Sequence, residues 1–437
     1  MRSFLISAAA LAFGVLLAGC NTGNGVVTVA STQSNLRVVN LIPNASGPIV
    51  TTLDDNSFLT PPIPFQSLSP YQIIKAGTHT LEAFVTGAPS NLIATTVVAI
   101  GEANYTYILF GPITNPVARI VDDTFLDSGA GSFNLRVINA AAGIGAVDIY
   151  LTAPGASLDL VSPSAAGIDY NNLSGFASLP IGNLQLRITP AGSKSVIYDS
   201  VPFNYQERAA YEIVVYSRGS GSLPNVMLLA IDSAGSGTVV DSLLAQFKVI
   251  NASLVTSPLN VFFDGVLRLS NIPVAGATGY QRTTKGAHTL TVEATATPGA
   301  TLLTYTPTLT AATDSSVVLE GTAGAMQALL LQDNNLPPGP GNARVRVVNT
   351  SPDLPAIDVF VNFSKQISGL PQNSGAFSLE LTADAVTGTT YQFSFNVAGT
   401  SQTLLTVPAL SLVGGKTYTL YVVGPSNALQ AGLTQDN

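Results

Sequence analysis

The residues best suited to metal binding or redox chemistry are scarce in this sequence. Among 437 residues there are 2 His and 1 Cys. A zinc site needs three or four converging His, Cys or carboxylate ligands, and a disulfide needs a second Cys. His79 and His288 occupy matching positions in Gly77-Thr78-His79-Thr80-Leu81 and Gly286-Ala287-His288-Thr289-Leu290. We interpret both as semi-buried packing positions at the start of a strand, and the sequence predicts no metal site and no cofactor.

The motifs that organise nucleophilic or phosphoryl chemistry are also missing from the sequence. No Ser lies in Gly-x-Ser-x-Gly, the turn that presents the nucleophile in one large class of hydrolases, and no Gly-x-Gly-x-x-Gly occurs. Gly415-Lys416-Thr417 imitates the end of a phosphate-binding loop, but Leu410 stands where the first Gly is required and a strand pattern follows. We therefore expect no catalytic residues and a protein that is not an enzyme.

Two further groups of residues could bind a ligand. Adjacent acids at Asp54-Asp55 and Asp122-Asp123 could bind calcium weakly, but no Asp-x-Asp-x-Asn-Gly loop supports this, and solvated turns are the better interpretation. An exposed aromatic platform could bind a glycan, and because Trp is absent only Tyr could supply it. The candidates lie in alternating patterns where packing is the better interpretation. They are Tyr105, Tyr107, Tyr150 and Tyr211.

The overall composition limits the class of protein. Lys+Arg 17 against Asp+Glu 25 gives a net charge of −8, and the pI is about 4.7. Nucleic acid is excluded as a partner, because phosphate binding needs clustered Lys and Arg. The chain is 46% hydrophobic and 10% charged, so it can bury cores and is not disordered throughout. Its length predicts about two to four domains.

The first twenty residues predict where the protein is located in the cell. Phe4 to Leu17 is an apolar run preceded by Arg2, which is typical of a secretion signal. It ends Leu17-Ala18-Gly19-Cys20, which resembles the lipobox of bacterial lipoproteins. The resemblance implies that residues 1–19 are a signal peptide, that the thiol of Cys20 is lipidated, and that the mature chain starts there. An ordinary secretory peptide ending in Cys is the alternative.

Lipidation at Cys20 would make the membrane a partner through a lipid anchor. About three acyl chains, as the resemblance implies, would anchor the protein stably, whereas one chain binds only marginally. Asn21 follows the Cys in place of the Asp that resembles an inner-membrane retention signal. We therefore expect a location in the bacterial cell envelope, in the outer membrane rather than the inner, facing the periplasm or the outside. Residues 20–34 are predicted to form a flexible tether.

One pattern recurs four times along the rest of the chain, about every 100 positions. It places an apolar residue, a basic residue, two apolar residues and then Asn. The copies are Leu36-Arg37-Val38-Val39-Asn40, Leu135-Arg136-Val137-Ile138-Asn139, Phe247-Lys248-Val249-Ile250-Asn251 and Val345-Arg346-Val347-Val348-Asn349. A second alternating run follows in each copy, and it contains Asp148 in the second copy and Asp358 in the fourth. Each copy also closes with a strand pattern that finishes on Asp: Asp122, Asp232, Asp333 and Asp436.

The periodicity inside a copy is two, as in Thr78 to Val85, which indicates short strands in antiparallel sheets. About seven such runs in about 100 residues fit a two-sheet sandwich. We predict an all-β chain of four tandem immunoglobulin-like antiparallel β-sandwich modules after a lipoprotein signal peptide. The likeness is architectural, because the Cys and Trp hallmarks of antibody domains are missing. The predicted modules span residues 35–130, 131–240, 241–340 and 341–437, and we expect 334–342, rich in Pro and Gly, to be an exposed linker.

Taken together, the repeated patterns resemble the bacterial domain of unknown function 4397. The resemblance covers nearly all of residues 35–437, with copies two and four closest. It implies a β-sandwich module found in tandem on secreted and lipid-anchored proteins. The family brings no established catalytic residues to transfer to this chain. In copy one the Asp is missing, and copy three has Asn260 in its place.

The spacing of Arg136 and Asp148, which recurs in Arg346 and Asp358, predicts a structural ion pair in each of those copies. If the two strands form a hairpin, these residues lie opposite each other on its outer face. Copies one and three would place Ile49 and Asn260 opposite the basic residue. We expect a non-catalytic cell-envelope protein that acts as a spacer or interaction module. The alternative is a surface adhesin or glycan-binding protein, and a protein or glycan ligand stays open.

Overall fold

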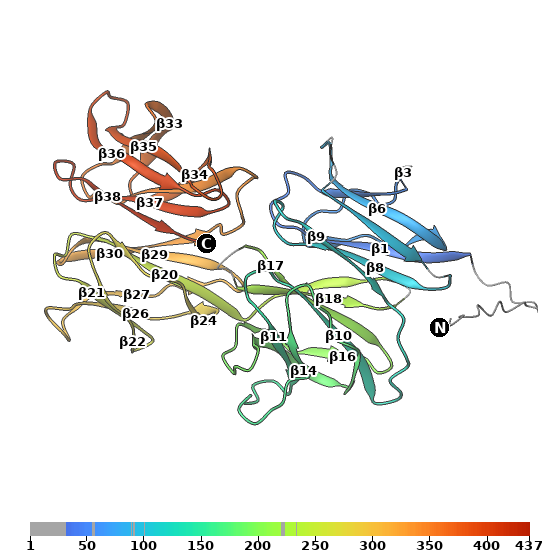
Figure 1. Cartoon of the computed structure of the whole chain (residues 1–437). Helices are drawn as coiled ribbons and strands as arrows, with labels where there is room; N and C mark the ends of the chain where they lie inside the picture. Colours follow the sequence, from blue (N-terminus) through green and yellow to red (C-terminus); the bar gives the residue numbers. More distant parts are fainter. Residues whose placement is uncertain are drawn as a thin grey trace, which may run out of the picture.

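A computed structural model describes residues 32–437, except 55, 56, 89, 91, 100, 220–222 and 233. Every regular element in this part of the chain is a β-strand, which confirms the all-β prediction. The strands pair only within four successive groups, which we call modules 1 to 4. Figure 1 shows them in colour order, with module 1 in blue, module 2 in green, module 3 in yellow and module 4 in orange to red.

The strands of the first two modules run from residue 33 to residue 240. Those of module 1 are β1 (Gln33–Leu41), β2 (Ile49–Leu53), β3 (Ser57–Phe58), β4 (Ser67–Leu68), β5 (Gln72–Lys75), β6 (Gly77–Val85), β7 (Ile93–Ala99), β8 (Asn104–Phe110) and β9 (Val117–Asp122). Those of module 2 are β10 (Ser132–Ala140), β11 (Val147–Thr152), β12 (Ala165–Ile168), β13 (Ala177–Pro180), β14 (Gly182–Pro190), β15 (Tyr198–Asp199), β16 (Phe203–Tyr205), β17 (Ala210–Ser217), β18 (Pro224–Ala230) and β19 (Gly237–Val240).

The strands of the last two modules run from residue 244 to residue 435. Those of module 3 are β20 (Leu244–Ser253), β21 (Leu259–Phe263), β22 (Val266–Ile272), β23 (Gly276–Ala277), β24 (Gln281–Thr284), β25 (Gly286–Ala287), β26 (Leu290–Ala294), β27 (Thr301–Tyr305), β28 (Thr308–Leu309), β29 (Asp314–Thr322) and β30 (Ala325–Asp333). Those of module 4 are β31 (Asn342–Asn349), β32 (Ala356–Val361), β33 (Ser364–Pro371), β34 (Ser374–Thr382), β35 (Thr389–Val397), β36 (Thr403–Leu412), β37 (Thr417–Val423) and β38 (Gln430–Gln435).

Each module is a sandwich of two main sheets with a shared topology. In the first sheet, the opening strand runs parallel to a late strand: β1 with β8, β10 with β17, β20 with β29 and β31 with β37. The late strand then pairs antiparallel with β9, β18, β30 or β38. The second sheet is built around β2 and β6, β11 and β14, β21 and β26, or β32 and β35. The sheets are thus antiparallel except for one parallel pair in each module.

The predicted hairpin between the first two long strands of a copy is wrong. In module 2, β10 pairs with β13 and β17, while β11 pairs with β12 and β14 in the other sheet. The chain therefore crosses between the sheets instead of turning back within one. Alternation still identifies the buried side chains, because Val137 from β10 and Ile149 from β11 meet in the same core. Side chains alternate along a strand, so the residues next to Val137 and Ile149 point away from the core. Arg136 and Asp148 therefore point to opposite outer faces of the sandwich.

The Asn that ends each repeated pattern shapes this crossing. Asn139 is fully buried, and its Oδ1 accepts the N–H of Ala141 two residues later. Its Nδ2 donates to the carbonyls of Gly145 and Ile168, which lie on the connection and on β12. Asn40, Asn251 and Asn349 make the same turn and each donates to a carbonyl farther along the chain. The buried amide therefore satisfies backbone groups where the chain leaves the first sheet.

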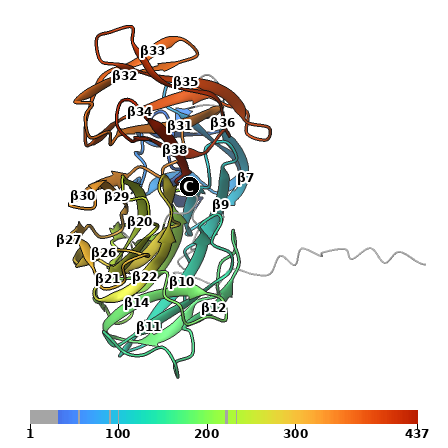
Figure 2. The same cartoon turned by 90° about the vertical axis from the view of Figure 1, so that its left-hand side faces the viewer.

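The modules are packed together in two pairs. One apolar cluster joins module 1 to module 2 and includes Val39 and Phe110 of module 1 and Ile138 and Tyr216 of module 2. A second cluster joins module 3 to module 4. In Figure 1 module 4 lies above module 3 and module 1 lies above module 2, and Figure 2 shows module 4 above module 3 from the side. We call the outer face of the first sheet, which packs against the neighbouring module, the pairing face.

The segment between modules 3 and 4 is partly buried, unlike the exposed linker expected from its Pro and Gly content. Asn335 is buried, and its Nδ2 donates to Asp314 at 2.7 Å and to the hydroxyl of Tyr280 at 3.1 Å. The guanidinium of Arg344 donates to the carbonyl of Leu336 at 2.8 Å. These contacts hold the segment against the two modules that it joins.

Candidate functional site

The basic residue of each repeated pattern lies on a pairing face. Arg37, Arg136, Lys248 and Arg346 are all buried. Each follows an inward residue of its strand, so its side chain projects from its own module towards the neighbouring one. A buried charge is costly unless it is paired and hydrogen-bonded. The partners of these four residues therefore determine what the repeated pattern does.

Arg136 links module 2 to module 1. Its Nε donates to Glu212 on β17 at 2.8 Å, and its Nη2 also contacts that carboxylate. Across the interface, its Nη2 lies 3.1 Å from Asp123 Oδ1, and its Nη1 donates to the carbonyl of Asp122 at 2.7 Å. The ring of Phe176 covers the guanidinium at 4.5 Å. One side chain thus binds a carboxylate in each of two modules.

Asp123 is the centre of the same cluster. Its Oδ2 accepts from Thr106 at 2.7 Å and from Tyr71 at 2.9 Å. Arg37 lies 3.8 Å from this carboxylate, and its Nη1 reaches into module 2 to donate to the carbonyl of Ala230 at 2.9 Å. Burial and the charge of Asp123 raise the pKa of Tyr71 well above its ordinary value, so this hydroxyl stays a donor. Asp123 therefore lies in a closed network and not in the solvated turn expected from the sequence.

Modules 3 and 4 are joined by two reciprocal ion pairs, in which each module supplies one basic and one acidic residue. Lys248 of module 3 contacts Asp436 of module 4, while Arg346 of module 4 lies 2.7 Å from Asp333 of module 3. Arg346 also donates to the carbonyl of Gln332 at 3.2 Å, as Arg136 does to Asp122. The reciprocal pairing indicates an approximate two-fold relation between the modules of a pair.

Strand register aligns these acids among the modules. Asp123, Asp333 and Asp436 occupy one position, and module 2 has Ile231 there. On the neighbouring strand, Thr106, Ser316 and Thr419 share a position that is Glu212 in module 2. Module 2 thus keeps a carboxylate beside its Arg, but on a different strand. Burial raises the pKa of Glu212, and the charge of Arg136 opposes this.

The ion pairs predicted from spacing do not form. Asp148 accepts the N–H of Gly167 and the N–H of Gly192, both at 2.8 Å. Asp358 accepts the N–H of Gly369 at 2.8 Å and of Gly399 at 3.1 Å, and it pairs with Lys365 at 2.6 Å. Arg136 and Arg346 instead bind acids on the pairing faces. The prediction failed because the two strands belong to different sheets.

These acids have a local structural role. The Gly residues that donate to Asp148 and Asp358 all have positive φ, a conformation that favours Gly. In both modules the adjoining edge strand pairs through a bulge. The carboxylate binds one backbone N–H in that edge strand and a second in the turn after β14 or β35, on the other side of the central strand. The bond with Lys365 lowers the pKa of Asp358. The matching position in module 1 is Val50, not Ile49 as expected, and Asn260 in module 3 accepts the N–H of Asn271.

Both histidines form a hydrogen bond with an aspartate that the sequence analysis missed. His79 Nδ1 lies 2.7 Å from Asp54, and His288 Nδ1 lies 2.8 Å from Asp264. Each Nε2 lies 2.8 Å from a backbone carbonyl, so both ring nitrogens face oxygen acceptors. The bond with Asp54 raises the pKa of His79 and lowers that of Asp54.

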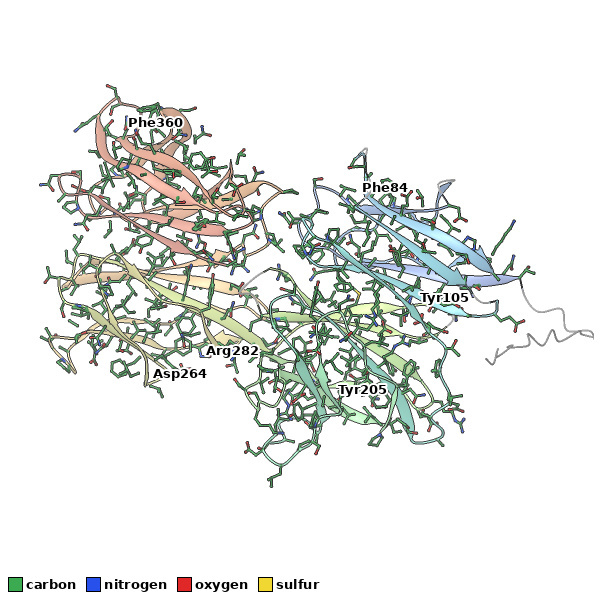
Figure 3. All side chains as sticks on the ribbon, viewed as in Figure 1. Phe84, Tyr105, Tyr205, Asp264, Arg282 and Phe360 are labelled. Atoms are coloured by element: carbon green, nitrogen blue, oxygen red, sulfur yellow. The ribbon has the colours of Figure 1, made fainter. Side chains whose placement is uncertain are left out.

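An imidazole bound in this way has no free nitrogen for catalysis or metal binding. Among the described residues, no group of three or more His, Cys, Asp and Glu side chains could hold a metal ion. In Figure 3, Asp264 lies at the edge of module 3 away from module 4, so this pair is also remote from the pairing face. The packing interpretation holds for His288, which stacks on Phe263 at 4.7 Å.

The four Tyr residues considered as a glycan platform are buried. Tyr105, Tyr107 and Tyr211 lie in the core of a module. Tyr150 lies outside the core but is also buried, with the ammonium of Lys194 4.6 Å from the centre of its ring. Tyr211, for example, packs edge-on against Tyr205, and Tyr105 and Tyr205 are marked within their modules in Figure 3. This confirms the packing interpretation, and these four residues cannot stack on a sugar in solution.

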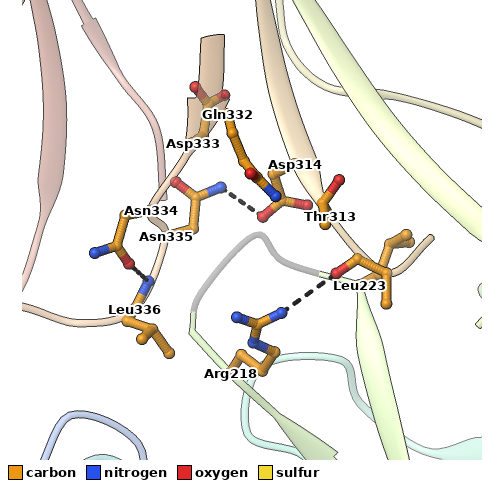
Figure 4. A pocket seen from close by; sticks show the side chains of 10 residues that line it. Arg218, Leu223, Thr313, Asp314, Gln332, Asp333, Asn334, Asn335 and Leu336 are labelled. Atoms are coloured by element: carbon orange, nitrogen blue, oxygen red, sulfur yellow. Dashed lines mark hydrogen bonds between the residues drawn. The ribbon is translucent and has the colours of Figure 1, made fainter. Parts of the chain in front are cut away.

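Two hollows lie where the module pairs meet. The larger, about 310 Å³, is lined by Gly, Pro, Ala and other residues with no acidic or basic side chain among them. The smaller, about 70 Å³, lies between Arg218 of module 2 and Asp314 and Asp333 of module 3 (Figure 4). There Asn335 donates to Asp314, and Asn334 Oδ1 accepts the N–H of Leu336. Among the described residues that line them, neither hollow combines a nucleophile with a free base, which acid–base catalysis requires.

The predicted signal peptide at residues 1–19, the lipidated Cys20 and the tether as far as residue 31 lie outside the described residues. Searching the described part of the chain for a helix that could span a membrane finds none.

Comparison with known proteins identifies one family. The model of the family described as "Domain of unknown function (DUF4397)" matches residues 34–150 and 245–360, which together make up more than half of the chain. A search of curated proteins finds no match to the chain.

Three solved structures are weakly similar. One is the family CBM26 module of Eubacterium rectale Amy13K in complex with maltoheptaose, with 10% identity, a TM-score of 0.15, and coverage of 47% of this chain and 95% of that one. The pneumococcal glycogen-degrading virulence factor SpuA is 10% identical with a TM-score of 0.17, and the match covers 86% of this chain and 37% of SpuA. The major pilin subunit BcpA of Bacillus cereus is 11% identical with a TM-score of 0.13, and the match covers 67% of this chain and 99% of BcpA. This chain spans just over a third of SpuA, and TM-scores of this size carry no argument about fold or ligand.

Proposed function

This chain belongs to the family described as "Domain of unknown function (DUF4397)", and from the way its modules are held together we propose that it is a non-catalytic spacer or interaction protein of the bacterial cell envelope. The proposal includes a lipid anchor at Cys20, in the outer membrane rather than the inner. The observation that carries it is the burial of the basic residue of every repeated pattern between modules.

A residue that repeats in every module could serve a ligand or the architecture, and here it serves the architecture. The guanidinium and ammonium groups bind carboxylates and carbonyls of the neighbouring module. A pair fixed by a buried apolar cluster and a charge network cannot bend at its internal junction without exposing both. Each pair is therefore a stiff body, as a spacer requires. The four Tyr residues offered for the glycan-binding alternative are buried, which counts against a platform made from them.

Small-angle X-ray scattering on the full chain tests the spacer. Because the charges are buried, we expect the radius of gyration to stay constant from about 0.05 M to about 1 M salt. Asp333→Asn, which removes the acid partner of Arg346, should increase the radius. The exposed Asp159→Asn is the matched control and should not. Scattering typical of four independently moving beads in the unaltered chain would overturn the proposal.

Cell fractionation tests the anchor. The unaltered protein should sediment with membranes, and Cys20→Ala should release it into the soluble fraction, because the acyl chains supply the membrane affinity. Mass spectrometry of the amino-terminal peptide should find an acylated Cys20 followed by Asn21. An unmodified thiol, or a mature chain that starts elsewhere, would refute the anchor. Protease added to intact cells then separates a surface location from a periplasmic one.

A further inference from the structure

A short extra strand covers the sheet edge of module 2. β19 pairs antiparallel with β18, with Val226 opposite Val240 and Leu229 opposite Gly237. The N–H of Ala230 points outward and donates to the carbonyl of Ser236 at 2.9 Å. Val239 packs against the cluster between modules 1 and 2, while Val240 packs against the core of module 2. An added strand of small and β-branched residues therefore extends both layers of packing.

β38 is the strand of module 4 that corresponds to β18. Register aligns residues 431–434 with residues 226–229 of β18, which β19 covers. Within the described residues, β38 pairs only with β37. Leu433 is 37% exposed, whereas the aligned Leu228 is 4% exposed. The edge that is covered in module 2 is thus open in module 4, with an apolar side chain beside it.

Among the described residues, β9 and β30 also pair on one side only, but the neighbouring module contacts the end of each of these strands. In modules 1 and 3, the partner's Arg donates to the carbonyls of Asp122 and Gln332 at the ends of β9 and β30. The aligned residue of β38 is Gln435, which faces a module that has Lys248 in place of Arg. The ammonium of Lys248 binds the side chain of Asp436 instead. β38 also lacks the Lys, Arg and Pro residues that protect sheet edges from further pairing.

We propose that the open edge of β38 binds an extended segment of a partner protein by antiparallel strand addition. The segment would resemble β19, with Thr or Val at successive positions, because β19 occupies the same edge in module 2. Its backbone would pair with the outward groups of Ala431, Leu433 and Gln435, and one of its side chains would cover Leu433. Backbone pairing supplies affinity in this mode of recognition, and the alternate side chains supply selectivity. The site does not depend on the spacer role.

A peptide with the sequence of residues 234–243 is the probe, mixed with the full chain, whose own β19 stays in place. We expect saturable binding by fluorescence anisotropy and slower hydrogen exchange of the segment 430–435. The same peptide with Pro in place of Thr238 should not bind, because in β19 the N–H of Thr238 faces Leu228 of β18 and Pro removes that backbone donor. Absence of saturable binding, or protection of β9 or β30 in place of β38, would overturn the proposal.

Two variants of Ala431 test the edge itself. Ala431→Pro removes an outward N–H, and we expect affinity for the peptide to fall by about tenfold or more. The equivalent strand β18 has Pro224 two residues before the position aligned with Ala431, so its nitrogen also faces away from β17. A Pro at such a position is therefore compatible with the fold of these modules. Ala431→Val keeps the N–H and should bind within about twofold of the unaltered chain. Equal binding by both variants would refute the edge, as would a dimer of the unaltered chain joined through β38.

A charge at position 433 gives an independent check. Leu433→Lys keeps every backbone donor and places a protective charge where the partner strand would pack. It should weaken peptide binding by about tenfold without changing the unfolding midpoint of the chain. Unchanged affinity in this variant would contradict the packing of the bound segment on Leu433, whatever the folding of the Pro variant.

Discussion

Asp123→Asn tests the charge cluster between modules 1 and 2. The cluster holds two guanidinium groups, from Arg37 and Arg136, and two carboxylates, from Asp123 and Glu212. The substitution keeps the shape and an acceptor oxygen for Thr106, but it leaves two positive charges facing one negative charge in a buried site. We expect the free energy of unfolding of this pair to fall.

The size of the loss follows from the distances. Asp123 lies 3.1 Å from Arg136 and 3.8 Å from Arg37. At an effective dielectric constant of about 20, opposite charges so placed attract by about 4–5 kcal/mol each. Asn no longer bears the cost of dehydrating a carboxylate, which offsets part of this. Removing one partner from a buried ion pair costs about 3–5 kcal/mol, and we expect a loss in that range.

Urea unfolding followed by hydrogen exchange of peptides from each module measures this loss and locates it. Exchange in modules 1 and 2 should begin at lower urea, while exchange in modules 3 and 4 should not change. Asp127→Asn is the matched control, because Asp127 pairs with Arg208 on the surface and both are exposed. That variant should lose only about 0–1 kcal/mol. Equal losses in the two variants would refute the cluster as a source of stability.

Three further predictions follow from other parts of the structure. Burial raises the pKa of Glu320, on the pairing face of module 3, to about 7 from 4.5, so stability should fall as pH rises through that window; Glu320→Gln should stabilise the chain at about pH 8 and not at about pH 4 by thermal unfolding. Asn139→Ala leaves the carbonyl of Ile168 without its buried donor and the carbonyl of Gly145 without its part-buried one, and it should cost about 1–3 kcal/mol in urea unfolding; no loss would contradict the role of the buried amide. Limited proteolysis should cut first in the exposed loop 153–162 and later in 334–341; the reverse order would contradict the buried linker.

The alternating pattern was sufficient to predict the fold class and many core residues. Arg136 and Asp148 are predicted from the sequence to lie on an outer face, so alternation turns their neighbours Leu135, Val137, Val147 and Ile149 inward, and all four lie in one core. A period of two depends only on the pleat of a strand and not on its partner. For the same reason the pattern could not say which strands are neighbours. The hairpin between the first two strands assumed that consecutive strands pair, and the structure places them in different sheets.

The charge clusters could not be predicted from patterns within one copy, because the residues of each cluster come from two different modules. A usable signal was nevertheless present: each copy has a basic residue in its first strand pattern and an Asp near its end. The repeat alignment placed Asp122 and Asp232 in that series, but register shows that Asp123 and Ile231 belong there. A shift of one residue turns a side chain to the other face of a strand, so the pairing faces stayed hidden.

The relocation of the acid in module 2 affects how four similar modules assemble correctly. Tandem copies can misassemble by docking on the wrong neighbour. If module 3 docked on module 2, Lys248 would meet Ile231, where module 4 offers Asp436. A buried ammonium without a carboxylate partner would destabilise that arrangement. The buried charges therefore favour docking of each module on its correct neighbour. Because a pairing face is satisfied only by the matching face of its partner module, the pair of modules is the smallest unit that can fold completely, and each first module stays incomplete until the second has folded.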